Sequence, residues 1–187
     1  MRQTRPVQLR RPRRVLVLGG ARSGKSSYAE RLLAGEREVE YVACGAAPGP
    51  EDDEWAQRVA AHRSRRPASW RTTETLDLPA VLGAPGPPVL VDCLTTWLAG
   101  VMDECGVWTD QPGADARLAG AVENLLAAWS TTRRRVVAVS NEVGGGIVPA
   151  TPSGRRFRDE MGILNARVAA GTQRVWLVTA GLPQRLR

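Results

Sequence analysis

The sequence contains few of the residues that make covalent or metal cross-links. Only three of its 187 residues are cysteines, and Cys44, Cys93 and Cys105 include no C-x-x-C pair. An odd number of scattered cysteines argues against a disulfide framework and a structural zinc site, and it is typical of a reducing compartment. A chain of this length buries roughly 70% of its unfolded surface and needs no such cross-link. We therefore expect a cytoplasmic protein with an ordinary hydrophobic core.

Long hydrophobic runs are also missing. The first apolar run, Val15 to Leu18, is interrupted by Gly19-Gly20 and then by Arg22, so it does not fit the apolar region of a secretory signal. No stretch approaches the roughly 20 apolar residues that a membrane-spanning helix needs. These absences predict a protein without a membrane span.

Lysine and histidine are each reduced to a single copy. Lysine and arginine together number 26, yet Lys25 is the only lysine, and His62 is the only histidine. Arginine has taken nearly every other cationic position. A lysine that persists in such a composition suggests a task that suits a compact ammonium and not a planar guanidinium. Lys25 and His62 are therefore the first candidates for chemistry.

The net charge of +7 is concentrated at the N-terminus, because residues 1–14 contain six arginines and no acidic residue. We expect residues 1–14 to be a basic, disordered arm and residues 15–187 to be a single domain of nearly neutral charge. A nucleic-acid-binding domain would carry its basic patch on a folded face, so we expect no nucleic-acid partner. A nucleic-acid-dependent NTPase stays an alternative, and salt-dependent RNA or DNA binding without the arm would support it.

Short hydrophobic runs alternate along the chain with longer amphipathic stretches. We expect strands at residues 15–18, 39–43, 89–92, 136–139 and 175–179, and helices at residues 25–34, 94–101, 114–130 and 155–170. A further helix should begin at the acidic residues 51–54 and end before Pro67. The alternation predicts an α/β fold with a mostly parallel sheet and helices on both faces.

A glycine-rich motif lies between the first expected strand and the first expected helix. Residues 19–26 read Gly19-Gly20-Ala21-Arg22-Ser23-Gly24-Lys25-Ser26 and satisfy G-x-x-x-x-G-K-[ST]. In such a loop the backbone N–H groups and the helix N-terminus surround phosphates. Lys25 would reach the β- and γ-phosphates, and the Ser26 hydroxyl would bind Mg²⁺. The motif predicts a nucleoside triphosphate site on a P-loop NTPase-like (RecA-like) fold.

Two acidic residues stand at the ends of expected strands. Asp92 follows the run Val89-Leu90-Val91, where a Walker B acid would lie beside the first strand and bind Mg²⁺. The alternative is that it caps the next helix. Glu142 ends another strand at the edge where open α/β sheets bind ligands. It is a weaker candidate for orienting metal or substrate, and a purely structural role stays open.

His62 lies in an arginine-rich segment, with Arg58, Arg63, Arg65 and Arg66 within four residues. Neutral imidazole is a good nucleophile near pH 7 and can form a covalent phosphoryl-type intermediate, and arginines bind phosphates. The alternative is a histidine packed on the apolar face of a helix. The residues alone leave both readings open.

Several segments together resemble the bifunctional adenosylcobinamide kinase/adenosylcobinamide-phosphate guanylyltransferase family of cobalamin biosynthesis. The resemblance runs from Val15 to Arg187. Besides the P-loop it rests on His62-Arg63, Arg66-Pro67, Trp70, Thr73-Glu74, Asp92-Cys93-Leu94-Thr95, Trp97-Leu98, Ser140-Asn141-Glu142-Val143-Gly144, Gly146-Ile147-Val148-Pro149, Arg156-Phe157-Arg158-Asp159, Leu164-Asn165 and Ala180-Gly181-Leu182-Pro183. The P-loop occurs in many enzymes, whereas this ordered set is far more specific.

The resemblance implies two reactions on one chain. The first transfers the γ-phosphoryl group of ATP or GTP to adenosylcobinamide. In the second, a histidine attacks the α-phosphate of GTP, and the GMP then passes to adenosylcobinamide phosphate. The family's guanylylated histidine matches His62. The resemblance also implies a homo-oligomer, since members of this family are commonly trimers. The substrates that it implies are a corrinoid and a nucleotide. The alternative is a single-function P-loop small-molecule kinase in which His62 is structural.

The family's nucleotide-contacting positions carry over to the P-loop and to three further places: Ala43, Cys44 and Gly45; Arg63, Ser64, Arg65 and Arg66; and Glu74 with Asp92. Two departures stand out. Cys44-Gly45 replaces the small hydroxyl residues that often follow the second strand. Gly145 stands where the family often has a bulkier residue, which predicts a looser loop at 144–146.

Overall fold

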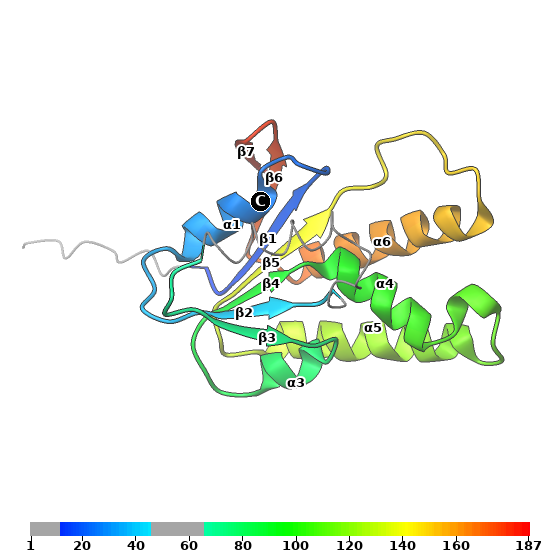
Figure 1. The fold of residues 1–187 in the computed structure, drawn as a ribbon, viewed down its shortest axis with the longest axis horizontal. Coiled ribbons are helices and arrows are strands. Elements are labelled where there is room, and N and C mark those ends of the chain that lie inside the picture. Colours follow the sequence, from blue (N-terminus) through cyan, green and yellow to red (C-terminus); the bar gives the residue numbers. More distant parts are fainter. Residues whose placement is uncertain (1–11, 46–65) are drawn as a thin grey trace, which may run out of the picture.

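The computed structural model describes residues 12–45 and 66–187. Its strands and helices alternate along the chain (Figure 1). In order they are β1 (Arg14–Gly19), α1 (Lys25–Leu33), β2 (Glu40–Ala43), β3 (Arg71–Glu74), α3 (Leu78–Gly83), β4 (Val89–Asp92), α4 (Leu94–Glu104), the 3₁₀-helix η1 (Val107–Thr109), α5 (Ala114–Thr131), β5 (Val136–Asn141), α6 (Pro152–Ala170), β6 (Arg174–Thr179) and β7 (Leu182–Arg185).

The strands form one 7-stranded sheet in the order β3-β2-β4-β5-β1-β6-β7. All neighbouring pairs are parallel except β6 and β7, which are antiparallel. Parallel neighbours need long crossovers, and helices supply most of them. The expected α/β architecture with a mostly parallel sheet is confirmed.

Helices cover both faces of the sheet, as expected. On one face α1 buries Ala29 and Leu33 against Val15, Val17 and Leu90 of the sheet. The other face is covered by α3, α4, α5 and α6, whose apolar residues pack against the alternate residues of the same strands. Figure 1 shows α1 apart from the group formed by α4, α5 and α6. Successive strand residues point to opposite faces, and helices cover both faces. β1 is therefore buried along nearly its whole length.

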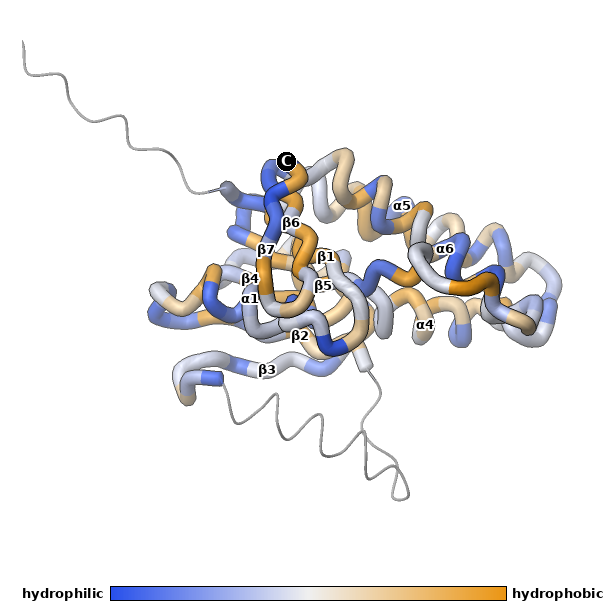
Figure 2. The backbone as a smooth tube through the Cα atoms, turned by 90° about the horizontal axis from the view of Figure 1, so that it is seen from above, coloured by the Kyte–Doolittle hydropathy of each residue, from blue (hydrophilic) through white to orange (hydrophobic). Residues whose placement is uncertain are grey.

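Both edge strands were missed by the sequence analysis. Residues 71–74 read Arg-Thr-Thr-Glu and are exposed except for the half-buried Thr73, and β7 is exposed throughout and contains Pro183. Figure 2 shows β3 as mostly hydrophilic beside the hydrophobic central strands. Edge strands bury little surface and tolerate proline and charge, so they carry no hydrophobic run. The last strand expected from the sequence therefore ends at residue 179, and β7 was not expected.

Helix boundaries differ from expectation where capping residues decide them. Helix α6 begins at Pro152, three residues before the expected start, because the Thr151 side chain accepts a hydrogen bond from Gly154 N at 3.1 Å and proline suits the first helical position. The short helix α3 was not expected. Asp77 caps it by accepting from Ala80 N at 3.0 Å. The helix expected from residue 51 lies outside the described residues.

The start of the sheet includes Arg14, which the sequence analysis assigned to the arm. Arg14 opens β1, and its Nε donates to Gly171 O at 2.9 Å. The backbone N–H groups of Arg13 and Arg14 both donate to Gln173 Oε1. Residues 1–11 lie outside the described part of the chain, so their disorder stays a prediction. No helix in the described residues is long and apolar enough to cross a membrane.

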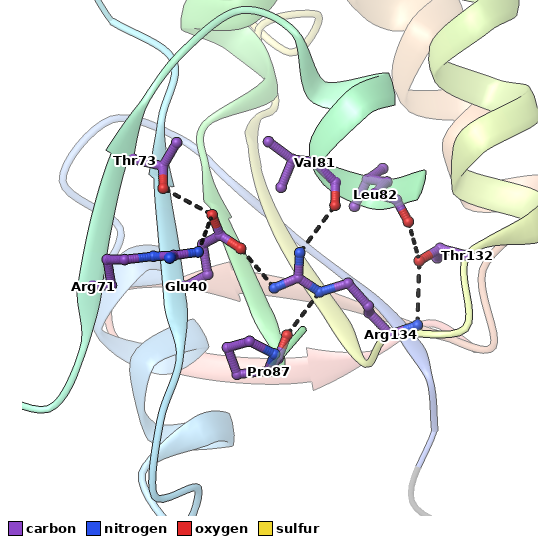
Figure 3. A network of polar contacts seen from close by, with 8 residues as sticks. All are labelled: Glu40, Arg71, Thr73, Val81, Leu82, Pro87, Thr132 and Arg134. Atoms are coloured by element: carbon purple, nitrogen blue, oxygen red, sulfur yellow. Dashed lines mark hydrogen bonds and ion pairs between the residues drawn. The ribbon is translucent and has the colours of Figure 1, made fainter. Parts of the chain in front are cut away.

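A buried ion pair connects the β2 side of the sheet with the start of β5 (Figure 3). Arg134 Nη2 donates to Glu40 Oε2 at 2.7 Å, and the two side chains are only 4% and 8% exposed. Thr73 and Arg71 contact the other carboxylate oxygen at 2.8 and 3.1 Å. Arg134 also donates to the carbonyl oxygen of Pro87 at 2.8 Å. Both charges are therefore satisfied inside the fold.

Candidate nucleotide-binding site

The candidate residues gather at the carboxyl edge of the sheet. Gly19 ends β1 and pairs with Asn141, and Ala43 ends β2 and pairs with both Glu74 and Asp92. Parallel strands bring their carboxyl ends to one edge, where open α/β sheets bind ligands. Along this edge the order is thus Glu74, Ala43-Cys44-Gly45, Asp92 and the P-loop, with the end of β5 between the last two. Candidates His62, Arg63, Ser64 and Arg65 lie outside the described residues.

Two glycines of the P-loop are required by its geometry. A Cβ atom at Gly19 would lie 2.5 Å from Ser23 Oγ and 2.6 Å from Val178 O, so no side chain fits there. Gly24 has φ +89°, in the left-handed region that favours glycine, and it immediately precedes α1. The loop therefore turns sharply into the helix N-terminus, as a phosphate-binding loop requires.

Lys25 lies over the loop that precedes it. Its Nζ donates to Gly20 O at 3.1 Å. A second contact comes from the turn between β6 and β7, where Gly181 N donates to Ser23 O at 2.8 Å. The loop conformation is thus stabilised by its own lysine and by the C-terminal hairpin. An ammonium already folded toward the loop is well placed to meet phosphates there.

Ser26 and Asp92 meet across the sheet edge. Ser26 Oγ donates to Asp92 Oδ1 at 3.4 Å. The sequence analysis expected Asp92 beside the first strand, which was wrong, because β5 lies between β1 and β4. The contact forms nonetheless, since Ser26 stands in the first turn of α1. Asp92 directly precedes Cys93, the N-cap of α4, whose capping interactions are made by Cys93 and Thr96. Asp92 is therefore not the capping residue of α4, and its carboxylate contacts Ser26 of α1 instead.

These two oxygens fit Mg²⁺ held together with a nucleotide. A hydroxyl and a carboxylate are ligands that Mg²⁺ prefers, and in nucleotide sites phosphate oxygens and water complete its octahedron. Among the residues that the structure describes, no three His, Cys, Asp or Glu side chains form a metal centre. One hydroxyl and one carboxylate leave most of the octahedron to phosphate oxygens and water, so this donor set supports a site shared with the nucleotide.

Tyr41 is a site residue that the sequence analysis did not nominate. Its hydroxyl donates to Asp92 Oδ2 at 2.9 Å, and the side chain is buried. Burial, reinforced by the Asp92 carboxylate, raises the pKa of Tyr41, so the hydroxyl keeps its proton and donates. A buried tyrosine needs a hydrogen-bond partner, which was the one available signal, but that signal does not name the partner.

Arg66 packs on Tyr41. Its guanidinium carbon lies 3.2 Å from the centroid of the Tyr41 ring, and Nη1 donates to Thr72 Oγ1 at 3.0 Å. This cation–π contact brings a positive charge close to the Tyr41–Asp92 pair. Of the four candidate residues 63–66, Arg66 is the one that the structure places, and it stands beside the candidate site.

Glu142 occupies the same edge in a different role. Its backbone N–H donates to Gly19 O at 3.1 Å, and its Oε1 accepts from Gly144 N at 2.8 Å. The carboxylate thus stabilises the turn into the glycine-rich loop. Beside it, Asn165 Nδ2 donates to Asn141 O at 3.0 Å, which ties the end of β5 to α6.

We expect Cys44 to react slowly with thiol reagents. Burial raises the pKa of its thiol, and Cys93 and Asp92 raise it further. The thiolate is the reactive form, so alkylation of Cys44 by iodoacetamide in the native protein should be about 10-fold slower than that of the half-buried Cys93. Peptide mass spectrometry over a labelling time course measures both rates. Equal rates would contradict the placement of Cys44 in the core.

The fold, the P-loop geometry and the Ser26–Asp92 contact define a P-loop nucleotide-binding protein. A solved structure of an ATPase from the type III secretion system of pathogenic bacteria is similar to this chain with a TM-score of 0.54. The two share 10% identity over 92% of this chain and 56% of the other. At that identity the likeness concerns the fold alone.

Sequence comparisons narrow this class to one family. The family model described as cobinamide kinase / cobinamide phosphate guanyltransferase matches residues 15–186. The chain is 44% identical to the bifunctional adenosylcobalamin biosynthesis protein CobP of Pseudomonas aeruginosa, covering 93% of this chain and 97% of that protein. It is 38% identical to CobU of Salmonella typhimurium, covering 92% and 99%. This chain belongs to the cobinamide kinase / cobinamide phosphate guanyltransferase family, and the resemblance stated from its motifs is confirmed.

Proposed function

We propose that this chain carries both activities of its family: phosphorylation of adenosylcobinamide with ATP or GTP, and transfer of GMP from GTP to the resulting phosphate. The observation that carries the proposal is the P-loop, in which Lys25 lies over the loop and Ser26 contacts Asp92, in a chain that the family model matches over residues 15–186. The nucleotide-binding positions proposed from the sequence lie along the same edge, as far as the structure describes them.

In the kinase step, the aminopropanol hydroxyl of adenosylcobinamide attacks the γ-phosphorus and gives up its proton. The bond from that phosphorus to the β–γ bridging oxygen breaks, and the nucleoside diphosphate leaves. Phosphoryl transfer depends mainly on positioning and charge stabilisation. Lys25 and the loop N–H groups supply positive charge to the β- and γ-phosphates. Bound Mg²⁺, held by Ser26 and Asp92, would neutralise phosphate charge.

In the guanylyltransferase step, we propose that an imidazole nitrogen of His62 attacks the α-phosphorus of GTP. A P–N bond forms, the bond to the α–β bridging oxygen breaks, and pyrophosphate leaves. A phosphate oxygen of adenosylcobinamide phosphate then attacks the same phosphorus and releases His62, which gives adenosylcobinamide-GDP. Arg63, Arg65 and Arg66 stabilise the phosphate charge. We propose that the enzyme acts in the cytoplasm as a homo-oligomer, and the trimers that are common in its family support a trimer.

Retention of labelled nucleotide on the protein tests this proposal. Purified protein is incubated with Mg²⁺ and GTP labelled at the α- or the γ-phosphate, and is then denatured. We expect only the α-label to stay bound, with the acid lability and alkali stability of a phosphoramidate. The His62→Asn variant should retain no label, while phosphorylation of adenosylcobinamide continues.

His62 is the chain's only histidine, so no other imidazole can take its place. An α-label held on an imidazole can therefore only be on His62. Absence of retained α-label in an otherwise active kinase would favour the single-function kinase. Label retained by His62→Asn would move the nucleophile to another residue.

A further inference from the structure

The pair Tyr41–Asp92 carries an inference beyond the activities proposed above. Tyr41 is 3% exposed, and its hydroxyl donates to Asp92 Oδ2 at 2.9 Å. The opposite oxygen, Oδ1, is the one that Ser26 Oγ contacts. The two carboxylate oxygens are thus divided between two donors. We propose that Tyr41 is a positioning residue that fixes the Asp92 carboxylate so that Oδ1 faces Ser26 and the bound metal–nucleotide.

The need for such a residue follows from the freedom of an aspartate side chain. Its terminal torsion has a broad, roughly two-fold preference, so a carboxylate held at one oxygen by a single long contact can rotate. The Ser26 contact, at 3.4 Å, is long for a hydrogen bond between oxygens. The bond from Tyr41, at 2.9 Å, is shorter, so it holds the carboxylate more firmly than the contact with Ser26 does.

Tyr41 is itself held in place from two sides. Its backbone lies within β2, between β3 and β4, where it pairs with Thr72 and Leu90. The guanidinium carbon of Arg66 lies 3.2 Å from the centroid of the Tyr41 ring, and Arg66 Nη1 donates to Thr72 Oγ1 at 3.0 Å. The hydroxyl therefore has little freedom to leave Asp92, and the contacts run from β3 through Arg66 and Tyr41 to the carboxylate.

Binding of Mn²⁺ together with β,γ-imido GTP tests the inference without any turnover. Groups that orient a metal ligand typically contribute 10- to 100-fold to metal affinity. We expect Tyr41→Phe to weaken Mn²⁺ binding in the nucleotide complex by about 10-fold, measured from the free Mn²⁺ signal in electron paramagnetic resonance. Affinity for the nucleotide alone, measured in EDTA, should not change. Tyr28→Phe is the matched control, since Tyr28 is the chain's other tyrosine and packs edge-to-face against Trp176 instead.

A second variant separates positioning from general damage to the fold. If Tyr41 acts only through Asp92, then Tyr41→Phe in an Asp92→Asn background should cause no further loss of Mn²⁺ affinity. Additive losses in the double variant would overturn the assignment, as would unchanged Mn²⁺ affinity in Tyr41→Phe. The inference rests on the proposed function, and the two fail differently. A wild-type protein that binds no Mn²⁺–nucleotide would contradict the proposed function itself.

Discussion

Replacing Lys25 by alanine is expected to slow phosphoryl transfer to adenosylcobinamide by about 10³-fold. The ammonium lies over the P-loop, 3.1 Å from Gly20 O, and it is the chain's only lysine. As the bond to the γ-phosphorus breaks, negative charge develops on the β–γ bridging oxygen and the leaving β-phosphate, so a cation fixed at this point stabilises the transition state more than the bound substrate. The loss should therefore appear mainly in kcat. Steady-state kinetics with varied ATP and GTP measure it.

Two further variants make the Lys25 result specific. Lys25→Arg keeps the charge but presents a planar, wider group, and we expect it to recover only a small part of the activity. Arg31→Ala removes one positive charge from the exposed side of the same helix and should leave kcat unchanged. Full activity in Lys25→Ala would contradict the P-loop assignment. An equal loss of activity in Arg31→Ala would show that the Lys25→Ala effect comes from the change in overall charge.

Replacing Glu40 by glutamine is expected to destabilise the protein by about 3–5 kcal/mol. The change leaves the guanidinium of Arg134, whose side chain is 4% exposed, without its carboxylate partner. Breaking a buried pair costs more than the pair contributes, because the remaining charge stays desolvated. Urea unfolding followed by circular dichroism measures the change. Glu123→Gln is the control, since its pair with Arg167 is exposed and should contribute less than about 1 kcal/mol.

The same network gives the stability a pH dependence. Burial by itself would raise the pKa of Glu40, but hydrogen bonds from Arg134 and Thr73 and the charges of Arg134 and Arg71 outweigh it and lower that pKa. Its contribution is therefore complete above the unfolded-state value of about 4.3 and is lost as the pH falls through the lower folded-state pKa. The wild type should lose stability more steeply than Glu40→Gln in this acidic range. Parallel pH profiles, or an unchanged unfolding midpoint in Glu40→Gln, would contradict this account of the pair.

The sequence predicted the centre of the fold better than its edges. Strands β1, β4 and β5 are buried on both faces and therefore appear as uninterrupted apolar runs, which the sequence analysis located within two residues of their observed ends. Strands β3 and β7 bury almost nothing and leave no such pattern. Strand order was also hidden. A hydrophobic run predicts that a strand exists but does not specify its neighbours, so the insertion of β5 between β1 and β4 was missed.

In the candidate site too, residues of a local motif were predictable from the sequence, and residues that depend on tertiary contacts were not. The P-loop was predictable because its chemistry lies in eight consecutive residues, with glycines required by local geometry. Tyr41 was not, because its role comes from a contact with Asp92, which is distant in the sequence and becomes a neighbour only through the pairing of β2 with β4. Arg66 was nominated through the family resemblance, but its stacking on Tyr41 is a tertiary contact that no motif describes.

The position of β1 has a consequence for synthesis on the ribosome. β1 emerges long before its neighbours β5 and β6, since Val15 pairs with Val137 and Arg174. A growing chain therefore exposes the apolar segment Val15 to Leu18, which is buried in the folded protein, until β5 and β6 have been synthesised. During that interval it is a target for chaperones and for aggregation. A message truncated before the codons of β6 would yield a sheet whose central strand has one open edge.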